Sequence, residues 1–410
     1  MKVRGGKRPP ARGKVALVCG GGGITGGVFE VGALRALDQA LGGGVVEHLD
    51  IYAGASAGSI VATLLAAGVS PNDMHRLIVA GSRNRWGLPA LSRKHIYGMD
   101  VAQWLATFAR VPAKATGSFV RGILPGEGTR PADAVFDAIK WIPSGIFTNR
   151  PLGRYVERVL AAVGTGSRFE DFGADLMITA VNVDTGTRVV FGEKGTRDVP
   201  VSVAIRASAA IPLLFRPVRI DEQDFVDGGI EDNVPVDVAV KHGASLVIAL
   251  NPLVPLVNDP RSDGSLLNGY RYLADHGMTS VLDQVFRMLV RSQVQQRLRT
   301  VRDRFPEVDV VVFEPEAADA TMFAYHPMRY SVRELIAEHA FQSTRERLIR
   351  DADHLTDLFA RQGLDFDVSR LGVDEPKEEK EGFVRRGLRL AGRIPKLRGW
   401  IEATDAPEPF

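Results

Sequence analysis

The pentapeptide Gly54-Ala55-Ser56-Ala57-Gly58 constrains the fold more than any other stretch of this chain. The apolar run 49–53 before it is typical of a buried strand, and the run 59–67 after it is typical of a buried helix. A strand, a sharp turn carrying a serine and a helix form a nucleophile elbow, in which only small residues fit beside the serine. The serine then lies at a helix N-terminus, where backbone N–H groups stabilise negative charge. The pattern predicts Ser56 as a nucleophile, although the pentapeptide alone also fits a close-packed turn.

A second glycine-rich turn follows the first predicted strand of the chain. The apolar run 15–19 leads into Gly20-Gly21-Gly22-Gly23, and helical spacing of apolar residues begins at Val28. A dinucleotide fingerprint fits the glycines, but it also needs an acidic residue at the end of the second strand, whereas Asp50 precedes that strand. A phosphate-binding loop needs Gly-Lys-Ser or Gly-Lys-Thr, which is missing after Gly27.

The remaining hypothesis for this turn is an oxyanion hole. Successive glycines leave backbone N–H groups unhindered, so that they can turn toward an anionic oxygen. The carboxyl ends of parallel strands meet at one edge of a sheet, where sites of such folds lie. Because both glycine turns follow strands, we expect the loop Gly20–Gly27 to lie at the same edge as Ser56.

A serine hydroxyl needs a base, and the sequence offers one carboxylate in a suitable turn. Asp227 ends the apolar stretch Phe225-Val226 and is followed by Gly228 and Gly229, which let another backbone approach closely. We predict that Asp227 is the base, with the two glycines completing its turn. Several histidines follow in the chain, as a Ser-Asp-His order would require, and four of them lie in no glycine-flanked loop after a strand: His242, His276, His326 and His339.

Strand and helix patterns alternate along the chain, which predicts an α/β fold with a mostly parallel central sheet covered on both faces. Strands are expected at 15–19, 49–53, 176–182, 188–191, 246–251 and 308–313. Helices are expected at 28–41, 59–67, 74–83, 100–110, 152–163, 201–210, 280–305 and 332–361.

Composition excludes several classes of protein. With one cysteine and a net charge of +2 in 410 residues, the chain has no cysteine-based zinc cluster and no overall attraction to nucleic acid. No run of about 18 apolar residues is present, so we expect no membrane-spanning helix. The N-terminus is basic without an apolar run behind it, which is unlike a signal peptide. We expect no metal and no cofactor, and a cytoplasmic protein that can lie at a membrane surface.

The chain divides by composition into a flexible basic arm at 1–13, a main domain at 14–372 and a charged amphipathic tail at 373–410. The main domain contains an insertion at about 84–150 with three of the four tryptophans and nine Lys or Arg against four Asp or Glu. The tail segment 382–400 carries six Lys or Arg and no acidic residue. Aromatic and basic residues together favour a lipid–water boundary, so we expect both segments to contact a lipid surface.

The motifs together resemble the patatin-like phospholipase family. The resemblance rests on segments that follow one another in the family's order: 20–26, 29–37, 54–58, 206–215 and 227–229. It implies a three-layer α/β/α domain and metal-independent hydrolysis of acyl esters, typically of lipids, by a Ser56–Asp227 dyad with Gly21, Gly22 and Gly23 as the oxyanion hole. The family's loop usually carries Arg or Lys where Thr25 stands and is about one residue shorter, so which glycines donate stays open.

Three hypotheses for function follow from these features. The first is a serine acyl hydrolase of phospholipase, lysophospholipase or lipase type with a lipid ester as substrate. The others are a Ser-His-Asp α/β-hydrolase and an inactive lipid-binding or scaffold protein. The sequence does not choose a headgroup, an acyl chain or an oligomeric state.

Overall fold

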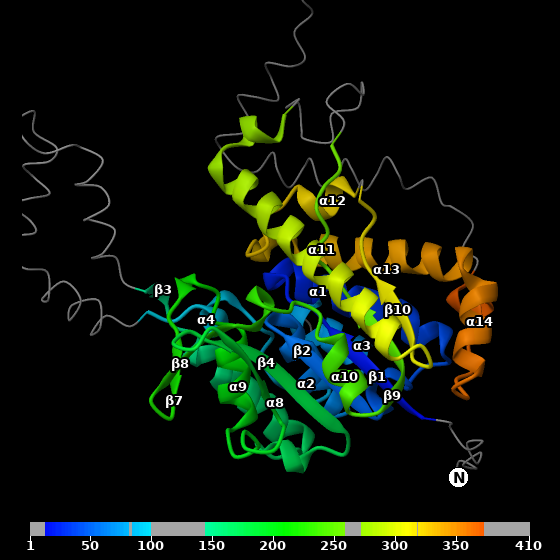
Figure 1. The fold of residues 1–410 in the computed structure, drawn as a ribbon, viewed down its shortest axis with the longest axis horizontal. Coiled ribbons are helices and arrows are strands. Elements are labelled where there is room, and N and C mark those ends of the chain that lie inside the picture. Colours follow the sequence, from blue (N-terminus) through cyan, green and yellow to red (C-terminus); the bar gives the residue numbers. More distant parts are fainter. Residues whose placement is uncertain (1–12, 82–83, 100–143, 259–271, 318, 373–410) are drawn as a thin grey trace, which may run out of the picture. The chain divides into compact units, whose positions relative to one another are not determined.

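A computed structural model of the protein describes residues 13–81, 84–99, 144–258, 272–317 and 319–372 (Figure 1). The chain divides into two compact units, Met1–Val368 and Ser369–Phe410. The first unit carries the sheet and the predicted site residues. In the second unit only residues 369–372 are described, as the end of a short 3₁₀ turn and the residue after it.

The described strands form one large mixed sheet in the order β10-β9-β1-β2-β4-β8-β7, with β5 also paired to β4. Five neighbouring strands, β10 through β4, are parallel, whereas β5 and β8 run antiparallel to β4 and β7 runs antiparallel to β8. A separate short pair consists of β3 (Gly145–Phe147) and β6 (Leu213–Phe215). The strands of the large sheet are β1 (Lys14–Cys19), β2 (Ile51–Ala55), β4 (Asp175–Asn182), β5 (Thr187–Phe191), β7 (Val218–Ile220), β8 (Gln223–Asp227), β9 (Ala244–Leu250) and β10 (Asp309–Phe313).

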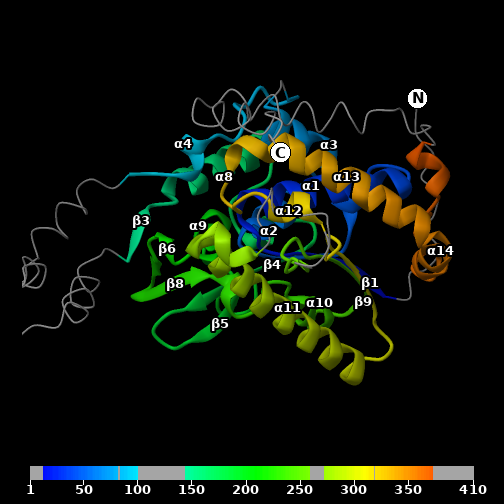
Figure 2. The same cartoon turned by 90° about the horizontal axis from the view of Figure 1, so that it is seen from above.

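Helices cover both faces of this sheet, as Figure 2 shows. On one face, Ala16 and Val18 of β1 join a buried apolar cluster with α10 (Val236–Lys241) and α11 (Met278–Arg304). Because strand side chains alternate, Leu17 and Cys19 face the other side, where α1 (Gly23–Ala40), α2 (Ala57–Ala66) and α13 (Arg333–Arg350) pack. The predicted three-layer α/β/α fold with a mostly parallel sheet is confirmed.

The remaining described helices are short or lie at the margins of these layers. The helices α8 and α9 pack on each other, and α9 contacts β4 and β8. The remaining α-helices are α3 (Pro71–Met74), α4 (Arg93–Ile96), α8 (Arg150–Val163), α9 (Val201–Ser208), α12 (Ala320–Phe323) and α14 (Ala352–Ala360).

Three predicted helix boundaries were wrong. The first helix begins at Gly23 rather than Val28, because tight packing of Gly26 on Pro252 outweighs the low helix propensity of glycine. The helix expected at 74–83 starts where Ser70-Pro71-Asn72-Asp73 signals a helix start, with Ser70 as its cap, but it ends with a π-helical turn at Ala80, because Gly81 adopts the left-handed conformation.

The third error concerns the helix expected at 332–361. It is two helices, because Asp351 leaves helical geometry (φ −98°, ψ 17°) between α13 and α14. Other predicted segments lie outside the described residues: the arm at 1–12, the helix at 100–110, Trp104 and Trp141 of the insertion, and the tail at 373–410. The domain bounds and the lipid contacts of those segments stay predictions. Within the described ranges, no helix has the length and apolar character needed to cross a membrane.

Candidate active site

The elbow at Ser56 has the strained backbone that its sequence predicts. Ser56 lies between β2 and α2 with φ 51° and ψ −125°, a conformation that a non-glycine residue rarely adopts. A Cβ on Gly54 would lie 2.6 Å from the Gly58 carbonyl oxygen, and one on Gly58 would lie 2.3 Å from the Cys19 carbonyl oxygen. The two glycines are therefore required by the close approach of β1, β2 and α2 at this turn.

The strand register brings Asp227 to Ser56. Ala55 at the end of β2 pairs with Thr179 of β4, and Asp227 at the end of β8 pairs with the next residue, Ala180. Because β5 occupies the other edge of β4 over residues 178–182, β2 and β8 share one edge and meet end to end. The serine after β2 and the aspartate that ends β8 therefore lie next to each other, although they come from distant parts of the sequence.

The two side chains form a buried hydrogen-bonded pair. Ser56 Oγ donates to Asp227 Oδ2 at 2.6 Å, and the Gly229 N–H donates to Asp227 Oδ1 at 2.8 Å. Ser56 is 4% exposed and Asp227 is 6% exposed. Burial raises the pKa of Asp227 to about 6, against the opposing effect of the Ser56 hydroxyl and the Gly229 N–H. This carboxylate can accept a proton at neutral pH and is poised to release it again.

The glycine loop lies beside Ser56 at the same sheet edge, as expected from the sequence. A Cβ on Gly21 would come within 2.8 Å of Ser56 Cβ, and Gly23 lines the same pocket as Ser56. The Gly21 N–H donates to Asn233 Oδ1 at 3.0 Å, so it is committed to holding the loop. Within the described ranges, the N–H groups of Gly22 and Gly23 donate to no acceptor. Of the three glycines predicted as donors, these two are the ones free to bind an oxyanion.

Asn233 is a residue that the sequence analysis missed. Its side chain accepts from the Gly21 N–H and donates to the Gly21 carbonyl at 3.1 Å, which clamps the loop from both sides. A second restraint is the Thr25 N–H, which donates to the Pro327 carbonyl at 2.9 Å. Asn233 comes six positions after Asp227 and just before the turn into α10. This place is typical of a capping or turn residue, and it is the sequence signal that could have indicated a role for Asn233.

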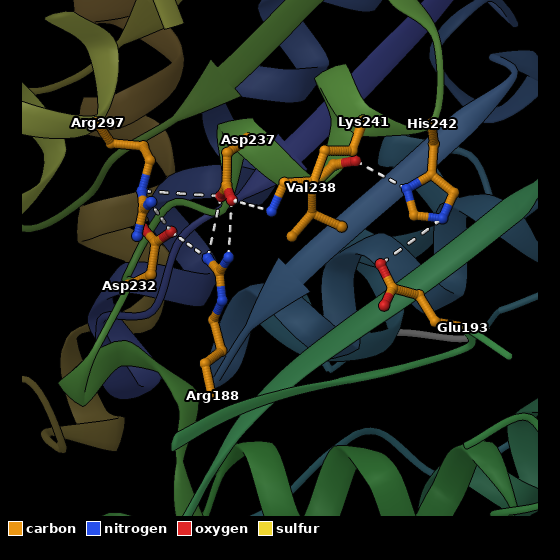
Figure 3. A network of polar contacts seen from close by, with 8 residues as sticks. All are labelled: Arg188, Glu193, Asp232, Asp237, Val238, Lys241, His242 and Arg297. Atoms are coloured by element: carbon orange, nitrogen blue, oxygen red, sulfur yellow. Dashed lines mark hydrogen bonds and ion pairs between the residues drawn. The ribbon is translucent and has the colours of Figure 1, made fainter. Parts of the chain in front are cut away.

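A buried ion network holds the segment that carries Asn233 (Figure 3). Asp232, 1% exposed, accepts from Arg188 of β5 and Arg297 of α11, and Arg188 also binds both carboxylate oxygens of Asp237. Although burial alone would raise the pKa of Asp237, the two hydrogen bonds from Arg188 hold it below its ordinary value. The network ties the strand, the helix and the Asp227–Asn233 segment into one unit.

The pocket in front of Ser56 is apolar. Arg333 is the charged residue of its described lining, and this guanidinium is held by the Val79 carbonyl and lies over the Tyr330 ring. No histidine belongs to that lining, and His242 and His339 instead contact the Val238 carbonyl and Asp319. The apolar residues that line the pocket include Ile24, Val28, Ile60, Val61, Ile78, Leu91, Ile96, Leu152, Ile211, Phe215 and Met328.

Comparison with protein families identifies the chain. Residues 17–240 match the profile described as "Patatin-like phospholipase", which is more than half of the chain and includes Ser56 and Asp227. The protein belongs to the patatin-like phospholipase family. The glycine loop, the elbow and Asp227 all lie inside the matched segment of the family, and Asn233 does as well.

Individual relatives are distant. "Probable lipid hydrolase 463L" of Invertebrate iridescent virus 6 is 22% identical over 221 residues, which is 54% of this chain and 62% of that protein. "Uncharacterized protein YqhO" of Bacillus subtilis (strain 168) is 22% identical over 225 residues, covering 51% of this chain and 65% of that protein. The matches therefore span less than two thirds of each of these relatives.

Solved structures of similar fold share still less sequence. VipD from Legionella pneumophila is 12% identical, with a TM-score of 0.32 over 100% of this chain and 91% of that one. ExoU from Pseudomonas aeruginosa, solved in complex with SpcU, is 17% identical, with a TM-score of 0.31 over 87% of this chain and 59% of that one.

Replacing Asn233 with alanine should slow catalysis and leave substrate binding in the pocket nearly unchanged. The glycine loop would lose both hydrogen bonds to the Asn233 side chain and keep the 3.3 Å bond from the Gly21 N–H to the Asn233 carbonyl, so the free N–H groups of Gly22 and Gly23 would be held less firmly. A displacement of about 1 Å at such a site costs on the order of a hundredfold in rate. We expect kcat for a soluble ester to fall by about that factor with KM nearly unchanged. A rise in KM at constant kcat would instead place Asn233 in substrate binding.

Proposed function

We propose that this protein is a serine acyl hydrolase that cleaves ester bonds of lipids. The observation that carries the proposal is the 2.6 Å hydrogen bond from Ser56 Oγ to the buried carboxylate of Asp227, at an apolar pocket and beside two free N–H groups. A nucleophile, a base and an oxyanion site within reach of one another are the minimum equipment for acyl transfer.

The proposed reaction has two half-reactions. Asp227 accepts the Ser56 proton while Oγ attacks the ester carbonyl, and the resulting oxyanion binds the N–H groups of Gly22 and Gly23 at the N-terminus of α1. The tetrahedral intermediate collapses, the C–O bond to the alcohol breaks, and Asp227 returns the proton to the leaving alcohol. A water molecule, deprotonated by Asp227, then attacks the acyl-enzyme and releases the fatty acid, which restores Ser56.

The pocket favours a long acyl chain as the group that is transferred. Its lining is almost entirely aliphatic and aromatic, so it can bury methylene groups, each worth about 0.8 kcal/mol. The viral relative is named a probable lipid hydrolase, which supports the same substrate class. We propose a lipid ester as substrate and leave the headgroup to experiment.

A panel of esters tests this proposal. The purified protein is incubated with p-nitrophenyl esters of increasing chain length and with phospholipid, lysophospholipid and triacylglycerol, and the released fatty acid is measured. We expect hydrolysis of p-nitrophenyl esters and of at least one lipid class, with kcat/KM rising with chain length. If no ester is hydrolysed while lipid still binds, the protein is an inactive lipid-binding member of the family.

The pH dependence of the reaction should report the raised pKa of Asp227. The base is active only when deprotonated, so kcat/KM for a soluble ester should be high above pH 6 and fall as the pH decreases through about 6. Because histidine titrates in the same range, the profile is repeated with His242→Gln and His339→Gln, which should leave the midpoint unchanged. A rate independent of pH between about 4.5 and 8 would contradict Asp227 as the base.

A further inference from the structure

The first half of α11 exposes its apolar side chains and buries its charged ones, which is the reverse of an ordinary surface helix. Seven large apolar side chains between Met278 and Leu289 are exposed, from Val281 at 38% to Met278 at 76%. At 3.6 residues per turn they fall on one side of the helix. This surface, called here the outer face of α11, consists of Met278, Val281, Leu282, Val285, Phe286, Met288 and Leu289.

Asp283, Gln284 and Arg287 of the same stretch point inward. The only charged residues between 278 and 290 are Asp283 and Arg287, which pair at 2.8 Å with side chains 14% and 2% exposed. Arg287 also donates to the Val254 carbonyl, and Gln284 bonds both the N–H and the carbonyl of Leu256. Since water would favour the opposite arrangement, the outer face is suited to an apolar surrounding.

The topology places this face at the edge of the sheet where Ser56 lies. Helix α11 leads directly into β10, which is parallel to β9, so its C-terminal end lies at the amino edge of the sheet. Its 27 residues extend about 40 Å, whereas the seven residues of β9 extend about 23 Å. The first half of α11 therefore stands at and beyond the carboxyl edge, packed on the segment 252–256 that follows β9.

The charge of the helix changes along its length. After the apolar first half come Arg291, Arg297, Arg299, Arg302 and Arg304, with Asp303 as the one acidic residue. A helix with an apolar face, a basic remainder and too little hydropathy to span a bilayer is typical of a helix that lies in a lipid–water interface. Arg291 directly follows the apolar half, so anionic headgroups would complement it, whereas Arg297 is paired with Asp232.

We propose that the outer face of α11 docks on a lipid surface and brings the sheet edge with Ser56 to it. The choice of a lipid surface rests on the proposed function, since the ester that enters the apolar pocket comes from such a surface. The same helix contacts the catalytic segments: Gln293 donates to the Ile230 carbonyl, and the 252–256 segment packs through Pro252 on Gly22. The proposed docking face therefore lies on a helix that contacts the segment after Asp227 and the segment packed on the glycine loop.

The test uses the full chain and vesicles of phosphatidylglycerol and phosphatidylcholine. Leu282 and Leu289, 58% and 59% exposed, are both replaced by serine in a Ser56→Ala background, which keeps the lipid intact. We expect the affinity for vesicles to fall at least about tenfold, because two apolar side chains no longer enter the interface. The matched control replaces Val183 and Ile349 with serine. These residues are 49% and 46% exposed elsewhere in the fold, and this variant should bind vesicles as the parent does. Thermal melting verifies that each variant is folded.

A second arm separates this inference from the proposed function. With Ser56 present, Leu282→Ser/Leu289→Ser should hydrolyse a soluble short-chain ester like the parent and hydrolyse lipid in vesicles more slowly. Unchanged vesicle binding with hydrolysis intact would overturn the docking face and leave the proposed function standing. If the parent hydrolyses no ester but still binds vesicles through the outer face of α11, the proposed function would be overturned and the docking face would stand. A parent that is dimeric by sedimentation and becomes monomeric in the double variant would make this face an interface between copies, and would overturn the proposal.

Discussion

Replacing Ser56 with alanine should reduce ester hydrolysis by at least about four orders of magnitude, because the acyl group would have no nucleophile. The fold should survive, since alanine fits where serine does and the elbow is held by Gly54 and Gly58. The variant would lose the hydroxyl that donates to Asp227, so the pKa of Asp227 should rise further. Steady-state assay with a soluble ester and thermal melting measure the two effects.

Ser202 offers a matched control for that substitution. It is equally buried, at 1% exposed, and its hydroxyl also donates to a carboxylate at 2.6 Å, that of Glu157 on α8. Ser202→Ala therefore removes the same kind of hydrogen bond outside the pocket and should leave the rate close to that of the parent. If Ser56→Ala were no slower than Ser202→Ala, another residue would be the nucleophile.

Asp227→Asn should lower the rate of ester hydrolysis by about three orders of magnitude or more, because an amide cannot accept the Ser56 proton. The side chain keeps its size, so a loss of rate reflects loss of the base and not of packing. Asp73→Asn is the control, because Asp73 is also buried, at 6% exposed, and also accepts from a serine, Ser70. Single-turnover rates with a soluble ester are the measurement.

The histidines decide between a dyad and a triad. His242 and His339 contact the Val238 carbonyl and Asp319, and no histidine belongs to the described lining of the pocket. Replacing His242, His276, His326 and His339 one at a time should leave most of the activity. A single histidine variant as slow as Asp227→Asn would establish a Ser-His-Asp mechanism instead.

The elbow and the glycine turns could be predicted from the sequence because their causes are local. A buried strand, a turn that tolerates only small residues and a helix start lie within a few positions of Ser56, and the same holds around Gly21 and Asp227. Whether Ser56 meets Asp227 depends on β2 and β8 sharing one edge of β4, which no local pattern encodes. Since β8 runs antiparallel to β4, the parallel sheet expected from the sequence did not by itself imply this meeting.

The roles of Asn233 and Asp232 escaped prediction, because they depend on contacts across long sequence separations. Asn233 is 212 positions from Gly21, and Asp232 is buried by arginines that come from β5 and α11. The start of α1 at Gly23 was also missed, because tertiary packing on Pro252 outweighs the low helix propensity of glycine there. A long helix was expected at 280–305 and is confirmed as α11, but the structure was needed to show that the apolar side of its first half faces outward.

Covalent labelling with a fluorophosphonate tests the central claim most directly, since the reagent reacts with a serine that a neighbouring base activates. The protein is incubated with the reagent, and the adduct is counted by intact mass and located by peptide mapping. We expect one adduct on Ser56 in the parent, none in Ser56→Ala and much slower labelling in Asp227→Asn. An adduct on a different serine, or labelling of Ser56 that is as fast in Asp227→Asn as in the parent, would contradict it.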